Sequence, residues 1–503
     1  MITPAILEAR NAVCAAPGDD DARTRLVQTY ADAGDEPRSA LIRIQLERAA
    51  LEAHERRAVE LDLAARALLG EHEARWRREE LPPSDRMRWG PFERGMVRGV
   101  WFDSPALLAK VGPECAKLCP LTHLVVDWPY PDDPPLPAMP NVRELTLTGT
   151  VYRTEDLARL VEMPLFASVR GLTLLDANLR GGLEALSDAG LEALRLPYHQ
   201  LPLSSLAPLI DAGCAGLREL VLEAAPATEH SGSGDDGHRP ALDERAGYAL
   251  ALWPGLSTLE SLDLSGNPIG VEGLSVLLAS PRSNALRRLR LARMPNDVEW
   301  DDALVGLRQG STPLAELDVC NNRLHSEAVE AIAQSDRCRA LRALSLSTVG
   351  GDLGPLRGAR CWKSLEVLAC DEASLPLLLD EPPPRLHSLV VNVADLDATL
   401  DALARVVLPN LLQLELRGVR DLSAVFARLD ETSMPSLRAL RVPGRITVEP
   451  EDLDAFRATP LGAALVSLDL DDPDLAVRGA YRAELEGDPY GAPGYQGPLR
   501  RLS

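Results

Sequence analysis

A hydrophobic pattern that recurs along most of the chain limits the fold more than any other feature. Segments 259–269 and 314–324 both place an aliphatic residue at positions one, four, six and eleven, and asparagine at position nine. Thirteen looser copies bring the total to fifteen, spaced 21 to 28 residues apart except for one interval of 42. Such self-similarity predicts a repeat architecture. The copies begin at Val97, Leu121, Val142, Val169, Leu191, Leu217, Leu259, Leu286, Leu314, Leu341, Leu365, Leu386, Leu411, Leu437 and Leu465.

Each copy predicts one strand followed by a helix or a loop. The aliphatic residues at positions four and six alternate with polar residues, which is typical of a strand with one buried face. Segments 271–278, 326–333 and 399–407 carry apolar residues at helical spacing. One strand and one helix cannot bury their own hydrophobic face, so neighbouring units must stack into a curved solenoid. In the intervals of only 21–24 residues, we expect a shortened helix or a loop.

The pattern resembles the leucine-rich-repeat family, whose unit is 20–29 residues. The long copies with a helix resemble the ribonuclease-inhibitor subtype. The resemblance implies an α/β solenoid, shaped as a horseshoe, with a parallel sheet on its concave face. Asn267 and Asn322 occupy the position of the family's asparagine, whose amide bonds to backbone groups left unpaired at the bend. Most other copies lack that asparagine.

Residues 1–90 carry no repeat and are predicted to be helical. Thr3 and Pro4 open a helix to about Cys14, and the run Asp19–Asp21 caps a second helix through Tyr30. A longer helix is expected from Glu36 to Leu69, with Glu52 and Arg56 as an i,i+4 pair on its solvated face.

This N-terminal segment is similar to the bacterial repeat-companion domain, a helical module that often precedes leucine-rich repeats. Tyr30-Ala31-Asp32, Gly34-Asp35, Arg38 and Gln45 match the family, whereas Ala33 stands where the family usually has tryptophan. The resemblance implies architecture and no chemistry. A helical cap on the exposed edge of the first repeat is one interpretation, and a separate docking module is the other.

Three parts of the chain follow from these patterns. Residues 1–90 form the helical cap, and residues 91–470 form the solenoid with an acidic insertion near 223–247. Residues 471–503, which are rich in proline, glycine and tyrosine, form a C-terminal cap or a tail.

Composition excludes several classes of function. The net charge of −22 disfavours binding to nucleic acid or to anionic membranes. No run of 18 apolar residues and no signal peptide occur, so neither a membrane span nor secretion is predicted. The eight cysteines have no metal-ligand spacing and are too few for a disulfide scaffold, which favours a reduced, cytoplasmic protein.

No catalytic or cofactor motif is present, so we expect no enzyme activity and no cofactor. His230 and His238 flank two aspartates in the acidic insertion, but a flexible acidic loop is favoured over a metal site there. Cys320 and Cys370 follow strands and are interpreted as small hydrophobic residues rather than nucleophiles, because no histidine falls at a matching position.

The residue between the two aliphatics of each strand should line the concave face. Two triplets of alternating charge occupy this position on consecutive strands: Asp263–Arg290–Asp318 and Glu415–Arg441–Asp469. Each triplet is either a self-neutralising ladder or a strip that binds a partner. Seven repeats carry an arginine directly after their first aliphatic residue, and these arginines form a basic margin. They are Arg98, Arg143, Arg170, Arg218, Arg287, Arg342 and Arg438. The candidate partner-binding residues are Trp101, Arg195, Asp263, Arg290, Asp318, Glu415, Arg441 and Asp469.

The sequence therefore predicts a non-enzymatic scaffold that binds a protein partner on its concave face. The alternative is a regulatory or inhibitory subunit that occludes the active site of a partner enzyme. The identity of the partner, the pathway and the oligomeric state do not follow from the sequence.

Overall fold

The computed structural model describes residues 2–470, apart from 83, 85, 129–132, 150, 176–177, 180, 182, 200, 212–213, 215, 225–241, 295–299, 310–311, 349–352, 430 and 444–449. Most of the predicted acidic insertion, with His230 and His238, lies outside the described residues. The predicted C-terminal cap or tail at 471–503 lies outside them too.

Contacts within the chain group it into two compact units. Unit 1 combines the helical segment before residue 84, residues 91–97 and the chain from Leu341 onward. Unit 2 combines residues 84–90 with the chain from Arg98 to Ala340. The grouping into units is based on contacts between residues. The boundary predicted near residue 90 is instead based on where the sequence repeat begins.

Every predicted repeat start is followed two residues later by a strand, which confirms the predicted α/β repeat solenoid. Consecutive strands of each unit pair in parallel, and β1 (Met87–Trp89) adds to β4 of unit 2 in antiparallel fashion. In unit 2 the strands are β4 (Gly99–Phe102), β5 (His123–Val126), β6 (Glu144–Leu147), β8 (Gly171–Leu174), β10 (Ala193–His199), β11 (Glu219–Ala224), β12 (Ser261–Asp263), β13 (Arg288–Arg290) and β14 (Glu316–Leu324). In unit 1 they are β15 (Ala343–Thr348), β16 (Val367–Asp371), β17 (Ser388–Asn392), β18 (Gln413–Arg417), β19 (Ala439–Val442) and β20 (Ser467–Leu470).

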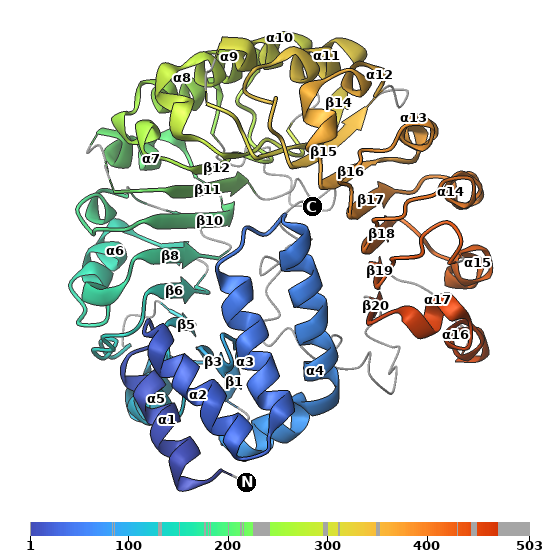
Figure 1. Cartoon of the computed structure of the whole chain (residues 1–503). Coiled ribbons are helices and arrows are strands. Elements are labelled where there is room, and N and C mark those ends of the chain that lie inside the picture. The colour runs from blue at the N-terminus through green and yellow to red at the C-terminus, as the bar shows by residue number, and fades with distance from the viewer. Residues whose placement is uncertain are drawn as a thin grey trace. The chain divides into compact units, whose positions relative to one another are not determined.

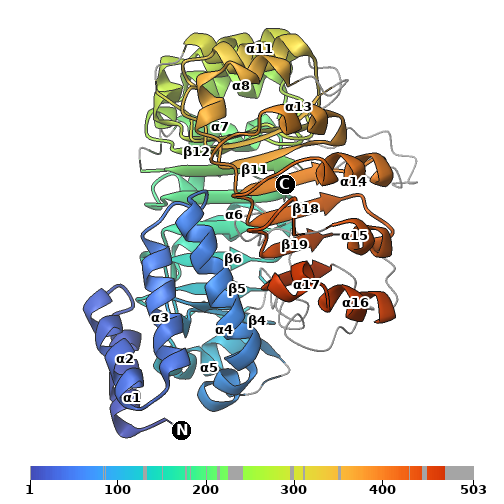
Figure 2. The ribbon, with the colours of Figure 1, turned by 45° about the vertical axis from the view of Figure 1, so that its right-hand side comes forward.

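Helices cover the outer side of the strands in each unit (Figures 1 and 2). Two predicted helices are confirmed as α9 (Val271–Ala279) and α11 (Ser326–Gln334). The third, α14 (Leu396–Ala404), begins earlier than predicted because the Asp395 carboxylate caps it by accepting from the Ala398 amide. The other helices of unit 2 are α5 (Pro105–Leu118), α6 (Thr154–Val161), α7 (Leu203–Asp211), α8 (Glu244–Leu252) and α10 (Trp300–Val305). Those of unit 1 are α12 (Gly354–Arg357), α13 (Leu375–Asp380), α15 (Leu422–Arg428), α16 (Pro450–Arg457) and α17 (Pro460–Ala464).

The shorter repeats carry shorter outer segments, as expected. The 22-residue repeat that begins at Val169 has a 3₁₀ turn, Glu184–Leu186, in place of a helix. The 21-residue repeat that begins at Leu365 has a 3₁₀ turn, Glu372–Ser374, followed by the six-residue helix α13. In both repeats the leucines of the strand are buried between the sheet and the outer layer.

The N-terminal helices are α1 (Pro4–Ala15), α2 (Asp20–Asp32), α3 (Glu36–Ala49) and α4 (Arg56–Glu80). The first two match the prediction, but the long helix predicted from Glu36 to Leu69 is wrong. It is interrupted after Ala49, and α4 runs back beside α3 (Figures 1 and 2).

Arg48 stabilises this reversal between α3 and α4. Its guanidinium donates to the Leu51 carbonyl at 3.1 Å and pairs with Asp62 of α4 at 2.9 Å. The predicted pair of Glu52 with Arg56 is also wrong, because Glu52 lies in the connection and Arg56 pairs with Glu60 at 3.0 Å.

A short hairpin of β2 (Phe92–Glu93) and β3 (Met96–Val97) packs on these helices. Met96 belongs to their buried core together with Tyr30 and Ile42. Gly95 turns the hairpin at φ 86°, and a Cβ at this position would lie 2.3 Å from a side-chain carbon of Ile42. Only glycine fits this approach.

The two predicted turn asparagines are buried and fully bonded. The Asn267 amide nitrogen donates to the carbonyls of Leu222 at 2.6 Å and Leu264 at 3.0 Å, and its oxygen accepts from the Leu242 amide at 3.2 Å. Asn322, which lies within β14, makes the equivalent bonds inside its own repeat and to the preceding repeat. Each asparagine thus joins neighbouring repeats through backbone groups, as predicted.

We predict that Asn267→Leu lowers the free energy of unfolding by about 3 kcal/mol, because several buried backbone groups lose their partner at once. The matched control is Asn410→Leu, at an exposed asparagine that donates to one carbonyl. Denaturant unfolding measures both variants. Equal stability of the two would show that the Asn267 bonds contribute nothing.

Candidate protein-interaction surface

The residues between the two leucines of each strand stand in register across the sheet of each unit. Asp263, Arg290 and Asp318 are direct neighbours on β12, β13 and β14. In unit 1, Glu415 is paired with Arg441, and Arg441 with Asp469. Both predicted triplets therefore lie on three consecutive strands in the predicted order.

Arg195 of β10 lies at the centre of an acidic pair. Its guanidinium bonds both carboxylate oxygens of Glu219, at 2.8 and 2.9 Å, and also reaches Glu144 at 2.8 Å. Glu144 lies two strands away on β6, so its side chain must cross β8. Gly171 makes this crossing possible, because a Cβ there would lie 2.1 Å from the Glu144 carboxylate.

Burial and the charges around Arg195 shift the pKa values of this region. Burial lowers the pKa of Arg195, but the hydrogen bonds and charges of Glu219 and Glu144 raise it above its ordinary value. On β5, burial and the charges of Arg98 and Arg195 lower the pKa of His123 to about 3. The neutral His123 ring lies 3.1 Å from the Thr146 hydroxyl.

The triplet Asp263–Arg290–Asp318 is less neutralised than a simple ladder. Asp263 accepts from the Ser265 amide at 2.9 Å, and Asp318 accepts from the Cys320 amide at 3.0 Å. Each aspartate thus has one oxygen bonded to the backbone amide two residues further along its own repeat. Among the described residues Arg290 forms no direct ion pair. Burial raises the pKa of Asp318, and the Arg290 charge opposes this by a smaller amount.

A further ion pair lies next to this triplet. Arg293 bonds Glu223, which follows the second leucine of β11. Burial and the neighbouring Asp263 charge raise the pKa of Glu223 despite that bond. Sequence analysis missed the pair because Arg293 lies outside the alternating segment of its repeat.

Trp101 lies at one end of the column in unit 2. The Arg88 guanidinium of β1 lies over its ring, 4.2 Å from the centroid, and the two residues are register partners. The ring is half-buried, so one part of it stays accessible.

In unit 1 the triplet Glu415–Arg441–Asp469 forms a true ladder. Arg441 lies 3.2 Å from Glu415 and 2.9 Å from Asp469, and Arg417 pairs with Glu415 at 2.6 Å. Only 1% of the Glu415 side chain is exposed. A buried and fully paired carboxylate is not available to a partner in this conformation.

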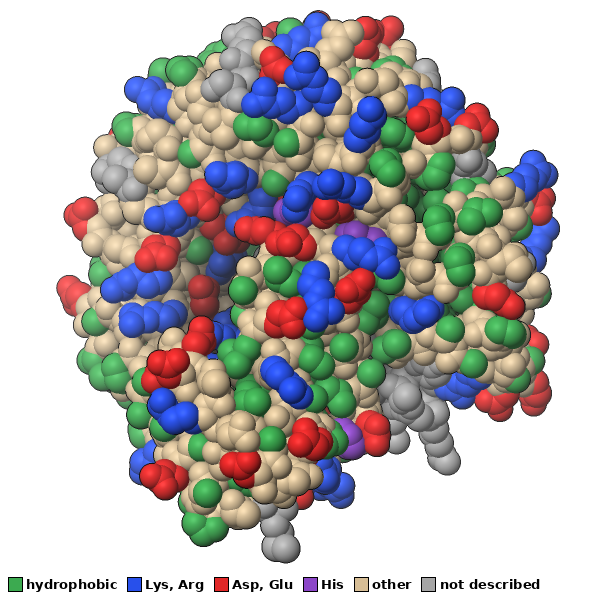
Figure 3. Space-filling model, viewed as in Figure 1, with side chains coloured by type: hydrophobic (Ala, Val, Ile, Leu, Met, Phe, Trp, Pro, Cys, Tyr) green, Lys and Arg blue, Asp and Glu red, His purple; other side chains and the backbone are tan. Residues whose placement is uncertain are grey.

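The predicted basic margin is largely engaged within the molecule. Arg218 pairs with Glu260 at 2.7 Å, and Arg143 donates to the Ser168 carbonyl at 2.9 Å. Arg342 pairs with Glu366 at 3.9 Å. Basic and acidic side chains are interspersed over the face seen in Figure 3.

The structure places no chemistry at Cys320 or Cys370. Both thiols are buried, and burial raises the pKa of Cys370 above its usual range. In the part of the chain that the structure describes, no group of His, Cys, Asp or Glu side chains could hold a metal ion. No helix among the same residues has the length and apolar character needed to cross a membrane.

We predict that only Cys214, the one half-buried cysteine of the eight, is alkylated at pH 8 in the native protein. Burial raises the pKa of Cys14, Cys115 and Cys361 to about 11, which further suppresses their thiolates. Iodoacetamide labelling followed by peptide mass spectrometry measures this, with Cys214→Ser as control. Labelling of Cys320 or Cys370 as fast as that of Cys214 would contradict the burial of these thiols.

Known proteins share limited similarity with this chain. A family model described as leucine-rich repeat matches residues 255–278, which include the turn asparagine Asn267. No curated protein sequence matches the chain. Among solved structures, an internalin from Listeria monocytogenes is 15% identical, with a TM-score of 0.30, over 65% of this chain and 81% of the other. A structure of the yeast Rad7 and Elc1 complex is 17% identical, with a TM-score of 0.37, over 69% of this chain and 84% of the other.

The fold class of this molecule is therefore an α/β repeat solenoid with a helical N-terminal segment in front of the repeats, and its segment 255–278 is similar to a leucine-rich repeat.

Proposed function

We propose that the protein is a non-enzymatic interaction scaffold, and that its protein partner binds the inner face of unit 2 around Arg195 and Arg290. The observation that carries the proposal is the column of charged residues in register on parallel strands. Neighbouring strands lie about 4.8 Å apart, which fixes the spacing of these charges before a partner arrives.

Preorganisation favours recognition by this surface. The Glu144 and Glu219 carboxylates hold Arg195 in place, and the backbone amides of Ser265 and Cys320 hold Asp263 and Asp318. A partner therefore loses little side-chain entropy in binding these groups. Arg290, which is half-buried, and Trp101 are of the residue types that dominate binding energy in protein interfaces.

As part of this proposal, the helical segment within residues 1–90 acts as a cap of the repeat-companion type. The hairpin Phe92–Val97, which directly precedes the first parallel strand, packs its buried Met96 on the helices. Covering the apolar edge of a terminal repeat is required for the solubility of a solenoid. All eight cysteines are free thiols, which supports action in a reducing compartment such as the cytoplasm.

Co-purification tests the proposal. We expect a protein retained from native lysate by the wild type to be retained at least tenfold less by the double variant Trp101→Ala/Arg290→Glu. The reason is that this variant removes an aromatic anchor and reverses the Arg290 charge, while the Arg195 cluster stays intact. Affinity is then measured by calorimetry with the purified partner.

The matched control reverses two exposed arginines on outer elements of the same unit, Arg245→Glu/Arg282→Glu. The control should bind as the wild type does. Equal binding by all three proteins, each with a native circular dichroism spectrum, would place the site elsewhere. If the partner is an enzyme that the protein inhibits at a one-to-one ratio, the alternative function of an inhibitory subunit holds.

A further inference from the structure

In unit 1, helix α4 lies on the inner face of the strands, opposite the outer helices. Figure 1 shows α4 beside β18, β19 and β20, with α15, α16 and α17 on the other side of these strands. The surface contacted by α4 and by the connection before it, which we call the helix-docking surface, comprises His387, Asn410, Leu412, Ala439 and Ser467.

The centre of this contact is apolar. Val59 and Leu63, four residues apart on one face of α4, form a buried cluster with Leu412 and Ala439. Leu412 directly precedes β18, and Ala439 is the first residue of β19. The exposed fraction of each of these four side chains is 6% or less.

Arginines flank the apolar pair at both ends of the same helix face. Arg56 donates to the Asn410 carbonyl at 2.7 Å, and Arg66 donates to the Ser467 hydroxyl at 3.5 Å. Positions 56, 59, 63 and 66 follow the i, i+3, i+7, i+10 spacing of one helical stripe. The sheet therefore recognises an aliphatic pair between two arginines.

The connection before α4 adds a second anchor. The buried His387 ring donates through Nε2 to the His54 carbonyl at 2.9 Å, and its other ring nitrogen lies 3.0 Å from the Ser388 hydroxyl. The His54 ring in turn lies 3.2 Å from the Arg342 guanidinium.

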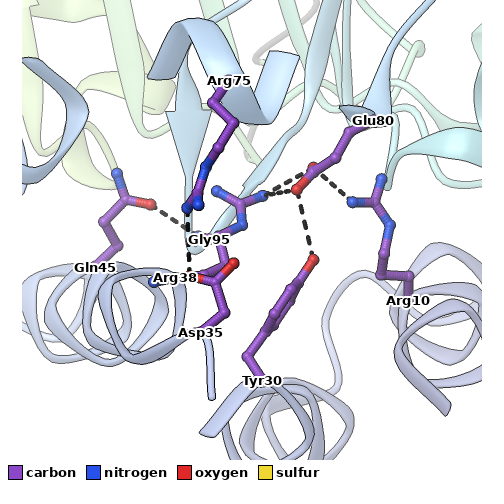
Figure 4. A network of polar contacts seen from close by, with 8 residues as sticks. All are labelled: Arg10, Tyr30, Asp35, Arg38, Gln45, Arg75, Glu80 and Gly95. Atoms are coloured by element: carbon purple, nitrogen blue, oxygen red, sulfur yellow. Dashed lines mark hydrogen bonds and ion pairs between the residues drawn. The ribbon is translucent and has the colours of Figure 1, made fainter. Parts of the chain in front are cut away.

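The N-terminal helices hold together by contacts that do not involve this surface. Glu80 at the end of α4 pairs with Arg10 of α1 at 2.5 Å and with Arg38 of α3 at 2.8 Å, and it accepts from the Tyr30 hydroxyl of α2 at 3.4 Å (Figure 4). The Arg38 guanidinium also lies over the Trp76 ring, 4.7 Å from its centroid. These buried links join all four helices, whereas the contact with the sheet rests on four apolar side chains and a few hydrogen bonds. None of these links involves a residue of the helix-docking surface.

We propose that the helix-docking surface is a binding site for an amphipathic helix, filled in this conformation by the chain's own α4. The partner is a protein helix with two aliphatic residues four apart, an arginine three residues before the first and another three residues after the second. Such a helix competes with α4, and its binding releases the N-terminal helices from the sheet. This surface is separate from the column in unit 2, so its test is independent of that proposed function.

A synthetic peptide of residues 52–69, labelled with a fluorophore, is the probe. The tethered α4 is present at a local concentration on the order of millimolar and excludes the peptide from the wild-type chain. In the full-length double variant Val59→Asp/Leu63→Asp, α4 loses its apolar contact. We expect this variant to bind the peptide at least tenfold more tightly than the wild type does, measured by fluorescence anisotropy.

Two controls make the result specific. Ala64→Asp/Ala67→Asp adds the same charges to exposed positions of the same helix and should bind no better than the wild type. Adding Leu412→Asp to the Val59→Asp/Leu63→Asp chain should abolish the gain, because the sheet side is then damaged. A folded Val59→Asp/Leu63→Asp chain that binds no more peptide than the wild type would overturn the proposal.

If the double variant does not fold, hydrogen exchange of the single variant Leu412→Asp tests the proposal instead. Hydrogen exchange should then accelerate in residues 56–69 and stay unchanged in α2. Acceleration throughout the chain, or none, would overturn the proposal.

Discussion

The structure depends on the burial of the two alternating apolar residues of the parallel strands. Leu262 and Leu264 of one repeat lie inside the core, as do Leu317 and Val319 of another. A single repeat cannot bury this face, so each unit exists only by stacking its strands in parallel. The same stacking aligns the residues between the aliphatics, which face inward in columns at fixed spacing. The packing of the core thus fixes the geometry of the inner surface.

Buried polar groups in this molecule are held by several bonds each. Asn267 bonds backbone groups of Leu222, Leu242 and Leu264, Arg195 bonds two glutamates, and Glu80 links α4 to three other helices. Leaving one such group unpaired costs more than the pair contributes, which makes each arrangement specific for one packing. The contact between α4 and the sheet is apolar at its centre, and its buried polar link runs from His387 to the His54 carbonyl in the connection before α4.

The repeat starts, the strands and the inner column could be predicted because a period of two is a local property of the sequence. The break between α3 and α4 could not, since residues 50–55 contain no proline or glycine and the Arg48–Asp62 pair that stabilises the reversal is tertiary. The Glu144–Arg195 bond across β8 was also missed, although glycine at position 171 was a usable signal. The contact between α4 and the sheet could not be predicted either, because it joins residues 354 positions apart. The spacing of Val59 and Leu63 is that of any amphipathic helix.

Whether the chain's own helix covers the inner face of unit 1 is tested most directly by cross-linking. Cysteines replace Leu63 and Ala439 in a Cys214→Ser background, and dilute native protein is equilibrated in an oxidising glutathione buffer so that adjacent thiols form a disulfide. We predict an intramolecular link between the two peptides, detected by mass spectrometry, and none when the exposed Ala64 replaces Leu63 as the cysteine position. No link from position 63, or equal links from positions 63 and 64, would contradict the contact.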